Sequence, residues 1–197
     1  VGRESAIIVR GQDGTIKAFA NVCRHRGSLV CLEAHGSTRK FTCPYHGWVY
    51  DTDGKLVGAR DMPEDFDWDA HGLHTVSCDT IHGLLFISFS DNPPSLENCK
   101  QELAEPMALF DFQNLTVSAY KEYPIPANWK LSIENYQECY HCSTIHPELS
   151  RISPPSSGEN LELKGSWMGG WMSIVEGAET MSLTGKSGGV AIQGLSE

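Results

Sequence analysis

The chain has 197 residues, of which 40% are hydrophobic and 20% charged, and its formal net charge is −10. This composition is typical of a globular protein, and the length suits one large or two small domains. The acidic balance argues against a nucleic-acid-binding protein, which needs clustered Lys and Arg to displace counterions from phosphates. The longest mostly apolar run, residues 83–89, is far shorter than the roughly 20 residues that cross a bilayer. We therefore expect no nucleic acid and no membrane among its partners.

The first half of the chain alternates short β-rich runs with turn signals. The dipeptides at 13–14, 35–36 and 53–54 each end in Gly, which favours tight turns between hairpin strands. These signals predict antiparallel sheet, with strands over residues 6–9, 16–20, 40–43, 48–50 and 84–89.

The composition changes after residue 91. Ser95 followed by Glu97 is typical of a helix N-terminus, and apolar residues recur after it, which predicts a linker helix within residues 93–115. Residues 116–123 are expected to form a strand. From Trp129 the apolar positions recur at spacings of four, three and four, which is helical. That helix should end near His146, because a following proline disfavours the α conformation.

Two short motifs each bring one cysteine and one histidine together. They are Cys23-x-His25 and, seventeen residues later, Cys43-x2-His46. A structural zinc site is one reading, since tetrahedral Cys2His2 sites are common, and chance coincidence is another. Zinc sites usually pair their cysteines in one loop and their histidines in the other. The mixed loops instead favour a [2Fe–2S] cluster, in which one iron takes both thiolates and the other both imidazoles.

A second constellation follows in the predicted helix. Glu138 and His141 are three residues apart and share a helix face, whereas His141 and His146, five apart, need a distorted backbone to meet at one metal. Two imidazoles with one carboxylate form the facial triad of non-haem Fe(II) oxygenases. Alternatively, Cys139 and Cys142 form a redox dithiol or half a zinc site, or His141 is a core histidine. For the seven cysteines as a set, ligand chemistry is favoured over cross-linking.

The sequence of the two loops resembles the cluster loops of Rieske non-haem iron oxygenases. The matching segments are Cys23-Arg24-His25-Arg26-Gly27 and Cys43-Pro44-Tyr45-His46-Gly47-Trp48. The resemblance implies that Cys23 and Cys43 bind one iron of the cluster and that His25 and His46 bind the other. Respiratory Rieske proteins carry an additional cysteine in each loop. Ser28 and Tyr45 stand at those positions here, which fits a reducing compartment and a cytoplasmic location.

The second constellation resembles the catalytic helix of the same family's large (alpha) subunits, through Asn128-Trp129-Lys130 and E-C-Y-H-C-x3-H-P. By this resemblance His141 and His146 bind a mononuclear Fe(II). Glu138 maps onto the catalytic bridging acid, which connects that iron to the cluster of a neighbouring subunit in a trimer. The third ligand, an Asp, is expected beyond residue 197. The acids Glu134, Glu148 and Glu159 do not match its position.

The resemblance also implies an α+β fold. We expect an antiparallel β Rieske domain at residues 1–92, the linker helix at 93–115, and at 116–197 the start of an incomplete helix-grip catalytic domain. The implied activity is oxidation of a C–H bond of a small molecule with O2, using electrons from an NAD(P)H-dependent reductase or a ferredoxin.

The acid at position 138 bears on the substrate. Glu rather than Asp there resembles the branch that acts on quaternary ammonium compounds, and Trp167 and Trp171 are either an aromatic box for such a cation or core residues. Hydroxylation of an aromatic ring or aromatic acid is the alternative. Two further classes are a Rieske electron-transfer protein that oxidises nothing itself and a zinc-bound interaction module.

Overall fold

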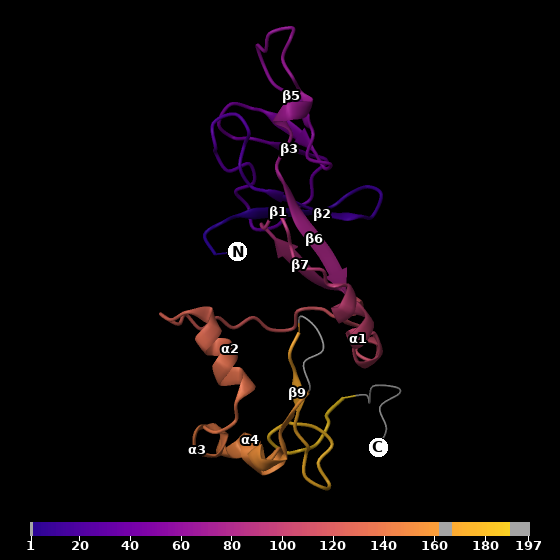
Figure 1. Ribbon diagram of the computed structural model, residues 1–197, viewed down its shortest axis with the longest axis vertical. Coiled ribbons are helices and arrows are strands. Elements are labelled where there is room, and N and C mark those ends of the chain that lie inside the picture. Colours follow the sequence, from indigo (N-terminus) through magenta and orange to yellow (C-terminus); the bar gives the residue numbers. More distant parts are fainter. Residues whose placement is uncertain (1, 162–166, 190–197) are drawn as a thin grey trace. The chain divides into compact units, whose positions relative to one another are not determined.

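A computed structural model of the chain describes residues 2–161 and 167–189 (Figure 1). The chain divides into two compact units, residues 1–93 and residues 94–197. Each unit is described by itself below.

The first unit is built from two antiparallel sheets. The larger sheet has the spatial order β1-β2-β6-β7, formed by Ala6–Arg10, Ile16–Ala20, Thr75–Ile81 and Leu84–Ser88. The smaller has the order β3-β4-β5, formed by Lys40–Thr42, Val49–Asp51 and Leu56–Gly58. A single 3-10 turn, η1 (Asp69–His71), precedes β6. Strands β2 and β6 lie more than fifty residues apart in sequence and pair through Ala18 with Val76.

The predicted hairpins are confirmed at the Asp-Gly turns. Strand β2 begins and ends where the pattern places it, and β1, β3, β4 and β7 agree to within one residue at each end. Gly14 and Gly54 have φ values of 81° and 80°, a region that glycine adopts without a steric penalty. Strands β5 and β6 have no counterpart in the sequence prediction. The signals used there were local, whereas β6 pairs with the distant strand β2 as well as with the adjacent β7.

The core of the first unit includes both motif cysteines. Cys23 and Cys43 are only 3% and 2% exposed and belong to the main apolar cluster. The other buried members of that cluster come from both sheets and the loops between them: Ile7, Phe19, Val30, Phe41, Trp48, Tyr50, Leu56 and Leu73. Packing at this density fixes the base of each motif loop, because a close-packed core allows little side-chain displacement.

The regular elements of the second unit, where it is described, are mainly helices. Its longer helices are α1 (Glu97–Ala108) and α2 (Trp129–Gln137). Its shorter elements are η2 (Phe112–Asn114), α3 (Cys142–Ile145), α4 (Pro147–Ile152), η3 (Pro155–Ser157), β8 (Glu159–Asn160) and β9 (Gly170–Trp171). Strands β8 and β9 pair with each other in antiparallel register.

The linker helix is present as α1. The N-cap residue is Leu96, which makes no side-chain capping hydrogen bond, and the Ser95 hydroxyl one residue earlier accepts a hydrogen bond from the Glu97 N–H at 3.2 Å. The strand predicted over residues 116–123 is wrong, because these described residues form no strand. A strand needs a partner backbone, and Val117 and Tyr120 are 87% and 81% exposed, without a neighbouring sheet to cover them.

The single helix predicted from Trp129 to His146 is wrong in its middle. Helix α2 begins after Asn128, whose side chain accepts from the Lys130 N–H, and ends at Gln137. Glu138 is extended, with φ −114° and ψ 152°, and the helical path resumes only at Cys142. The predicted end near His146 is confirmed, since α3 stops at Ile145 and a new helix starts at Pro147.

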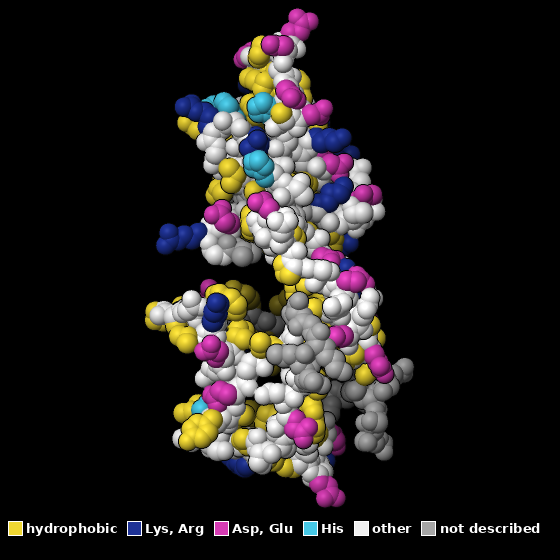
Figure 2. All heavy atoms as spheres, in the orientation of Figure 1, with side chains coloured by type: hydrophobic (Ala, Val, Ile, Leu, Met, Phe, Trp, Pro, Cys, Tyr) yellow, Lys and Arg dark blue, Asp and Glu magenta, His cyan; other side chains and the backbone are white. Residues whose placement is uncertain are grey.

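The second unit exposes many large apolar side chains. Figure 2 shows hydrophobic side chains over much of its visible surface. They include Trp129 at 69%, Tyr136 at 84% and Tyr140 at 98% exposure. In the part of the chain that the structure describes, no helix is long and apolar enough to cross a membrane.

Candidate functional site

The two motif loops of the first unit have the same backbone frame. In each loop a glycine N–H donates to the carbonyl of the cysteine four residues earlier at 3.0 Å, Gly27 to Cys23 and Gly47 to Cys43. In each loop the cysteine N–H also donates to the carbonyl five residues further on, at 2.8 Å. Both glycines have a φ of 74°, a left-handed conformation that favours glycine. Two loops of equal shape therefore present one cysteine and one histidine each.

Tyr50 lies beside the sulfur atoms of these loops. This side chain is fully buried, and its hydroxyl is 3.3 Å from the Cys23 Sγ. The same hydroxyl oxygen accepts a hydrogen bond from the Arg24 N–H at 3.0 Å, so its own hydrogen is available to the sulfur. Burial, followed by the contact with Cys23, raises the pKa of Tyr50. The hydroxyl therefore stays protonated and can donate to a Cys23 thiolate.

The two motif histidines meet at the exposed ends of the loops. The Nδ1 atoms of His25 and His46 are 3.1 Å apart, and the His25 ring stacks on Trp48 with 4.8 Å between centroids and 10° between planes. Two ring nitrogens this close need a proton or a cation between them, because their lone pairs repel. Desolvation by the surrounding atoms, followed by the neighbouring charges of His25 and Arg26, lowers the pKa of His46. The lowered pKa of His46 favours its neutral imidazole, the form that binds a metal.

These four side chains separate into two chemically distinct pairs. Both cysteines are buried beside Tyr50, while both histidines are exposed and turn Nδ1 toward each other. Figure 2 shows histidine side chains gathered on the visible face of this unit. The arrangement fits a group with one sulfur-liganded and one nitrogen-liganded iron.

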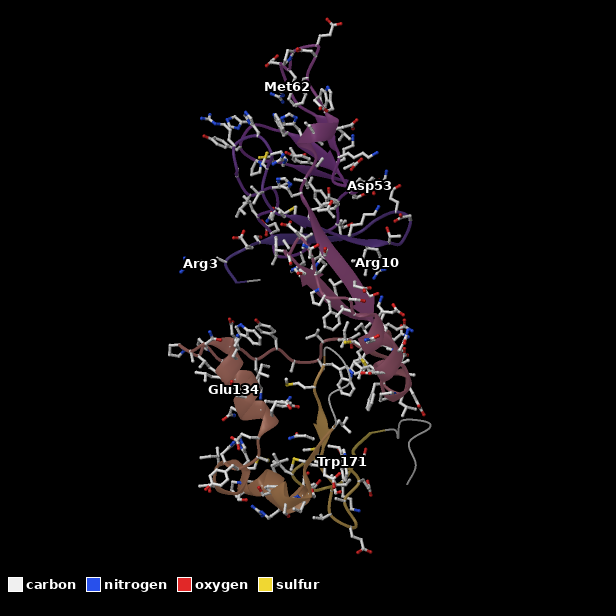
Figure 3. All side chains as sticks on the ribbon, in the orientation of Figure 1. Arg3, Arg10, Asp53, Met62, Glu134 and Trp171 are labelled. Carbon is white, nitrogen blue, oxygen red and sulfur yellow. A yellow bond between two sulfur atoms is a disulfide. The ribbon has the colours of Figure 1, made fainter. Side chains whose placement is uncertain are left out.

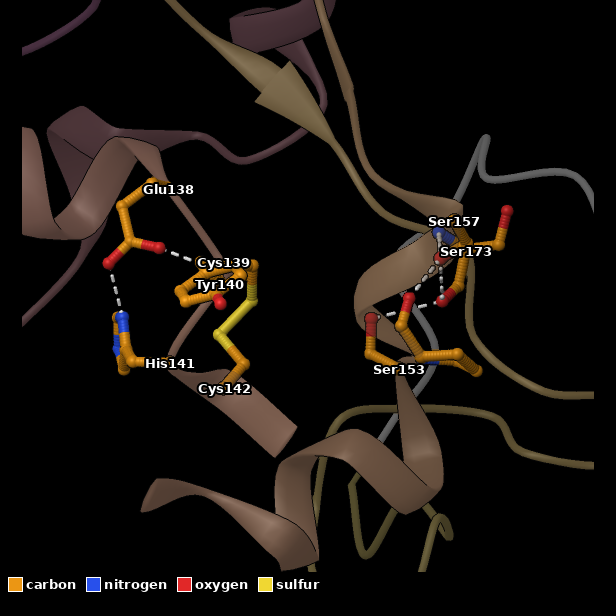
Figure 4. The surroundings of a disulfide bond; sticks show 9 residues. Glu138, Cys139, Tyr140, His141, Cys142, Ser153, Ser157 and Ser173 are labelled. Atoms are coloured by element: carbon orange, nitrogen blue, oxygen red, sulfur yellow. Dashed lines mark hydrogen bonds and ion pairs between the residues drawn. A yellow bond between two sulfur atoms is a disulfide. The ribbon is translucent and has the colours of Figure 1, made fainter. Parts of the chain in front are cut away.

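Glu138 and His141 are in direct contact in the second unit. The carboxylate Oε1 lies 2.5 Å from the His141 Nδ1, and the Tyr140 N–H donates to the Oε2 (Figure 4). The hydrogen bond from His141, followed by that from Tyr140, holds the pKa of the Glu138 carboxyl below its usual value. A histidine whose Nδ1–H donates to a carboxylate keeps the Nε2 lone pair free for a metal.

His146 lies close to His141. Their ring centroids are 5.3 Å apart and the ring planes are inclined by 74°. The backbone between them is distorted as the five-residue spacing requires, with His146 itself at φ −125° and ψ 58° between two helices. The contact of Glu138 with His141 arises differently from the prediction. It is made across an extended residue and a tight loop, and not along the face of a continuous helix.

Cys139 and Cys142 are joined by a disulfide, with their Cα atoms 4.9 Å apart. The expectation of ligand chemistry over cross-linking is therefore wrong for this pair. The other five cysteines are free thiols. Since Cys139 and Cys142 are bonded to each other in the structure, the half-zinc-site reading has no support in this geometry.

The structure leaves other predicted residues apart from the histidine pair. Glu134 projects from helix α2 (Figure 3), Glu148 pairs with Arg151 at 3.8 Å, and Glu159 lies exposed in β8. Within residues 2–161 and 167–189 no group of three or more His, Cys, Asp or Glu side chains is arranged to hold a metal ion. None of these three acids therefore joins His141 and His146 in such a group.

Neither tryptophan of the proposed aromatic box belongs to the buried core of the described residues. The Trp167 Nε1–H donates to the Glu102 carboxylate on helix α1, and Trp171 is 49% exposed in β9 (Figure 3).

Tyr50 is a site residue that sequence reasoning missed. Its signal was a hydroxyl-bearing aromatic in the strand that immediately follows the second loop.

Comparison with known protein families matches nearly the whole chain. Residues 1–79 match the Rieske [2Fe-2S] domain, and residues 112–197 match the catalytic domain of the ring hydroxylating alpha subunit. The first match agrees with the paired loops and defines the chain as a Rieske iron–sulfur protein. Together the two matches show that it belongs to the Rieske non-haem iron oxygenase large (alpha) subunits. The cofactors implied by these domains are a [2Fe–2S] cluster and a mononuclear iron.

Several relatives carry a substrate in their names. The glycine betaine monooxygenase oxygenase subunit of Chromohalobacter salexigens is 48% identical over 76% of this chain and 34% of its own length. The carnitine monooxygenase oxygenase subunit of Escherichia coli K12 is 38% identical over 75% of this chain and 40% of its own. A crystal structure of the quaternary ammonium Rieske monooxygenase CntA superposes with a TM-score of 0.76 at 29% identity, over 88% of this chain and 49% of that one. The chain thus spans between a third and a half of these relatives.

Proposed function

We propose that this chain is part of the oxygenase component of a Rieske monooxygenase that oxidises a quaternary ammonium compound. The observation that carries the proposal is the arrangement of the two histidine pairs. His25 and His46 face each other through Nδ1, and His141 lies beside His146 with its Nδ1 bound to Glu138. The names of the relatives support the substrate class.

The cluster ligands are assigned as two pairs. Cys23 and Cys43 hold one iron of the [2Fe–2S] cluster, and His25 and His46 hold the other. The buried position of the sulfur atoms and the exposed position of the imidazoles support this assignment. Tyr50 donates a hydrogen bond toward Cys23 and so favours the electron-rich state of the cluster.

The mononuclear iron is assigned to His141 and His146, with a third ligand from outside the described residues. Glu138 holds the Nδ1 proton of His141, which orients the ring and leaves Nε2 for the metal. The carboxylate has further lone pairs, so it can also accept from a histidine of a neighbouring subunit in a homotrimer. When bound, the cluster supplies single electrons and the iron supplies the site at which O2 oxidises a C–H bond.

The remaining parts of the proposal concern partners, location and extent. We place the Rieske domain at residues 1–92, the linker helix at 93–115 and the start of the catalytic domain at 116–197. Electrons come from an NAD(P)H-dependent reductase or a ferredoxin, and the location is cytoplasmic. An aromatic substrate is the second candidate, favoured by one relative, the large oxygenase component of salicylate 5-hydroxylase of a Ralstonia species, which is 33% identical over 83% of this chain.

A purely electron-transferring Rieske protein is the different class to be weighed. Such a protein has no use for a second histidine pair beside a carboxylate. The 2.5 Å contact of Glu138 with His141, and the 5.3 Å separation of the His141 and His146 rings, therefore favour the oxygenase.

Metal analysis and a substrate screen test the proposal. The purified protein should contain iron and acid-labile sulfide, with a Rieske-type visible and electron paramagnetic resonance spectrum that His46→Ala abolishes. His141→Ala is the matched variant, which should keep this spectrum and lose only the mononuclear iron. Zinc in place of iron, or a cluster signal unaffected by His46→Ala, would contradict the ligand assignment.

The substrate class is tested with the complete oxygenase and its reductase. Betaine-type compounds should stimulate O2 and NAD(P)H consumption, and oxidation at an N-methyl group should release formaldehyde. Aromatic acids are the comparison substrates. Turnover with the aromatic acids alone would reject the quaternary ammonium class and retain the oxygenase assignment.

A further inference from the structure

The Cys139–Cys142 disulfide lies inside the segment that carries the candidate iron residues. Glu138 immediately precedes it in the sequence, and His141 lies between its two cysteines (Figure 4). The proposed cluster and iron ligands do not include either cysteine. The proposed function therefore assigns no role to this disulfide.

The disulfide closes a short loop that fixes the surroundings of Glu138. The loop contains Tyr140 and His141, and both oxygens of Glu138 are bonded to it, Oε2 by the Tyr140 N–H and Oε1 by the His141 Nδ1. A cross-link reduces the number of conformations available to the residues that it encloses. The bonded position of the carboxylate is therefore favoured while the disulfide is intact.

The pair is also placed to exchange with external thiols. Cys139 is half-buried and Cys142 is 5% exposed, so an attacking thiolate reaches the Cys139 sulfur more readily. The Cys142 N–H donates to the Cys139 carbonyl at 3.1 Å. This backbone bond does not depend on the sulfurs, and it keeps the two cysteines close after reduction, so the disulfide can form again.

We propose that Cys139 and Cys142 form a reversible thiol–disulfide switch that controls how firmly Glu138 is held against His141. The reductant is a dithiol. One of its thiolates attacks a disulfide sulfur, the Cys139–Cys142 bond breaks, and the second thiolate completes a new disulfide within the reagent. Two electrons and two protons pass to the protein, which gains two thiols. In a reducing compartment such a pair serves redox sensing and not permanent cross-linking.

The Tyr140 amide reports the state of the switch directly, because its hydrogen is bonded to Glu138. Reduction should increase the exchange rate of that amide by about fivefold or more, the lower end of usual coupling between sites. Far-UV circular dichroism should stay the same, since helix α2 ends before the enclosed loop and helix α3 begins at its last residue.

The experiment equilibrates the full chain in buffers of oxidised and reduced dithiothreitol at varied ratio. Alkylation and peptide mass analysis then count the thiols at positions 139 and 142, and hydrogen exchange is measured in each state. We expect one two-thiol transition that Cys139→Ser or Cys142→Ser abolishes. Cys31→Ser, which removes a half-buried free thiol of the first unit, is the control and should leave the transition unchanged.

Two outcomes would overturn the proposal. One is a pair that remains as two thiols in the oxidising buffer or as a disulfide in excess dithiol. The other is an exchange rate of the Tyr140 amide that is the same in both states, which would show that the disulfide does not affect the position of Glu138. The wild-type measurement needs no substitution, so a variant that does not fold leaves the test intact. Thiol counting does not depend on iron content, so its result is independent of the metal analysis above.

Discussion

Replacing Tyr50 by Phe removes one hydroxyl from beside the cluster loop. The ring is fully buried in the core, and its hydroxyl lies 3.3 Å from the Cys23 Sγ and 3.0 Å from the Arg24 nitrogen. Phe keeps the ring and its packing. The substitution therefore isolates the hydrogen bond to sulfur from the effects of cavity formation.

The expected effect is a lower reduction potential of the cluster. A hydrogen bond to sulfur stabilises the more negative, reduced state more than the oxidised state. If the difference is about 1 kcal/mol, the middle of the usual net range for one hydrogen bond, the potential falls by about 40 mV for a one-electron couple. The Arg24 N–H also loses its acceptor, which should lower the free energy of unfolding by about 1 kcal/mol.

Potentiometric titration followed by circular dichroism or electron paramagnetic resonance measures this shift. Tyr45→Phe is the matched control. Tyr45 is 60% exposed, its ring lies against His46, and its hydroxyl has no hydrogen-bond partner in the described part of the chain. The control should leave the potential within about 10 mV of wild type, since no hydrogen bond to sulfur is lost. An unchanged or raised potential in Tyr50→Phe would refute the assigned role of the hydroxyl.

Three further predictions concern other residues. Glu138→Gln should keep cluster and iron yet lower product formation at least tenfold, measured as coupled turnover, and unchanged turnover contradicts it. The hydrogen bond from His141 lowers the pKa of Glu138 below its ordinary value of 4.5. The ionised carboxylate should therefore stabilise the fold above pH 4.5, and this stabilisation should be lost as the pH falls through the folded-state pKa. Urea unfolding measured against pH, with Glu138→Gln as the reference, checks this. Gly54→Ala should lower the free energy of unfolding in urea by about 3 kcal/mol, because the added Cβ would lie 2.4 Å from the Phe19 ring at a positive φ. Gly14→Ala is the control: it also has a positive φ, but no described atom lies within 4 Å of its Cβ, so it should lower the free energy of unfolding by only about 1 kcal/mol.

Local chemistry made much of the first unit readable from the sequence. An Asp-Gly pair between β-rich runs specifies a hairpin turn wherever it occurs, and Gly14 and Gly54 adopt the positive φ that such turns need. The two Cys-His loops could also be predicted from the sequence, because the spacing of candidate ligands depends on a few consecutive residues. The ring nitrogens of His25 and His46 meet even though the two residues are twenty-one positions apart, since each loop has its own backbone hydrogen bonds.

The sequence alone could not determine features that depend on distant or unpaired backbone. The apolar spacing from Trp129 predicts a continuous helix, and nothing in it indicates that Glu138 is extended or that its carboxylate bonds the loop after it. The run at 116–123 has strand-like residues but, where described, no partner strand. Periodicity records which face of a segment is apolar, whereas a ladder or a helix break also depends on what lies beside the segment.

The sequence by itself determined which residues are the candidate metal ligands and which turns hold them. Tertiary structure alone decided the pairing of β2 with β6, the placement of the Tyr50 hydroxyl against Cys23, and the closed loop that bonds Glu138 to His141. The physical reason is range. Ligand type and turn preference are properties of neighbouring residues, whereas burial and cross-strand pairing depend on residues that only folding brings together.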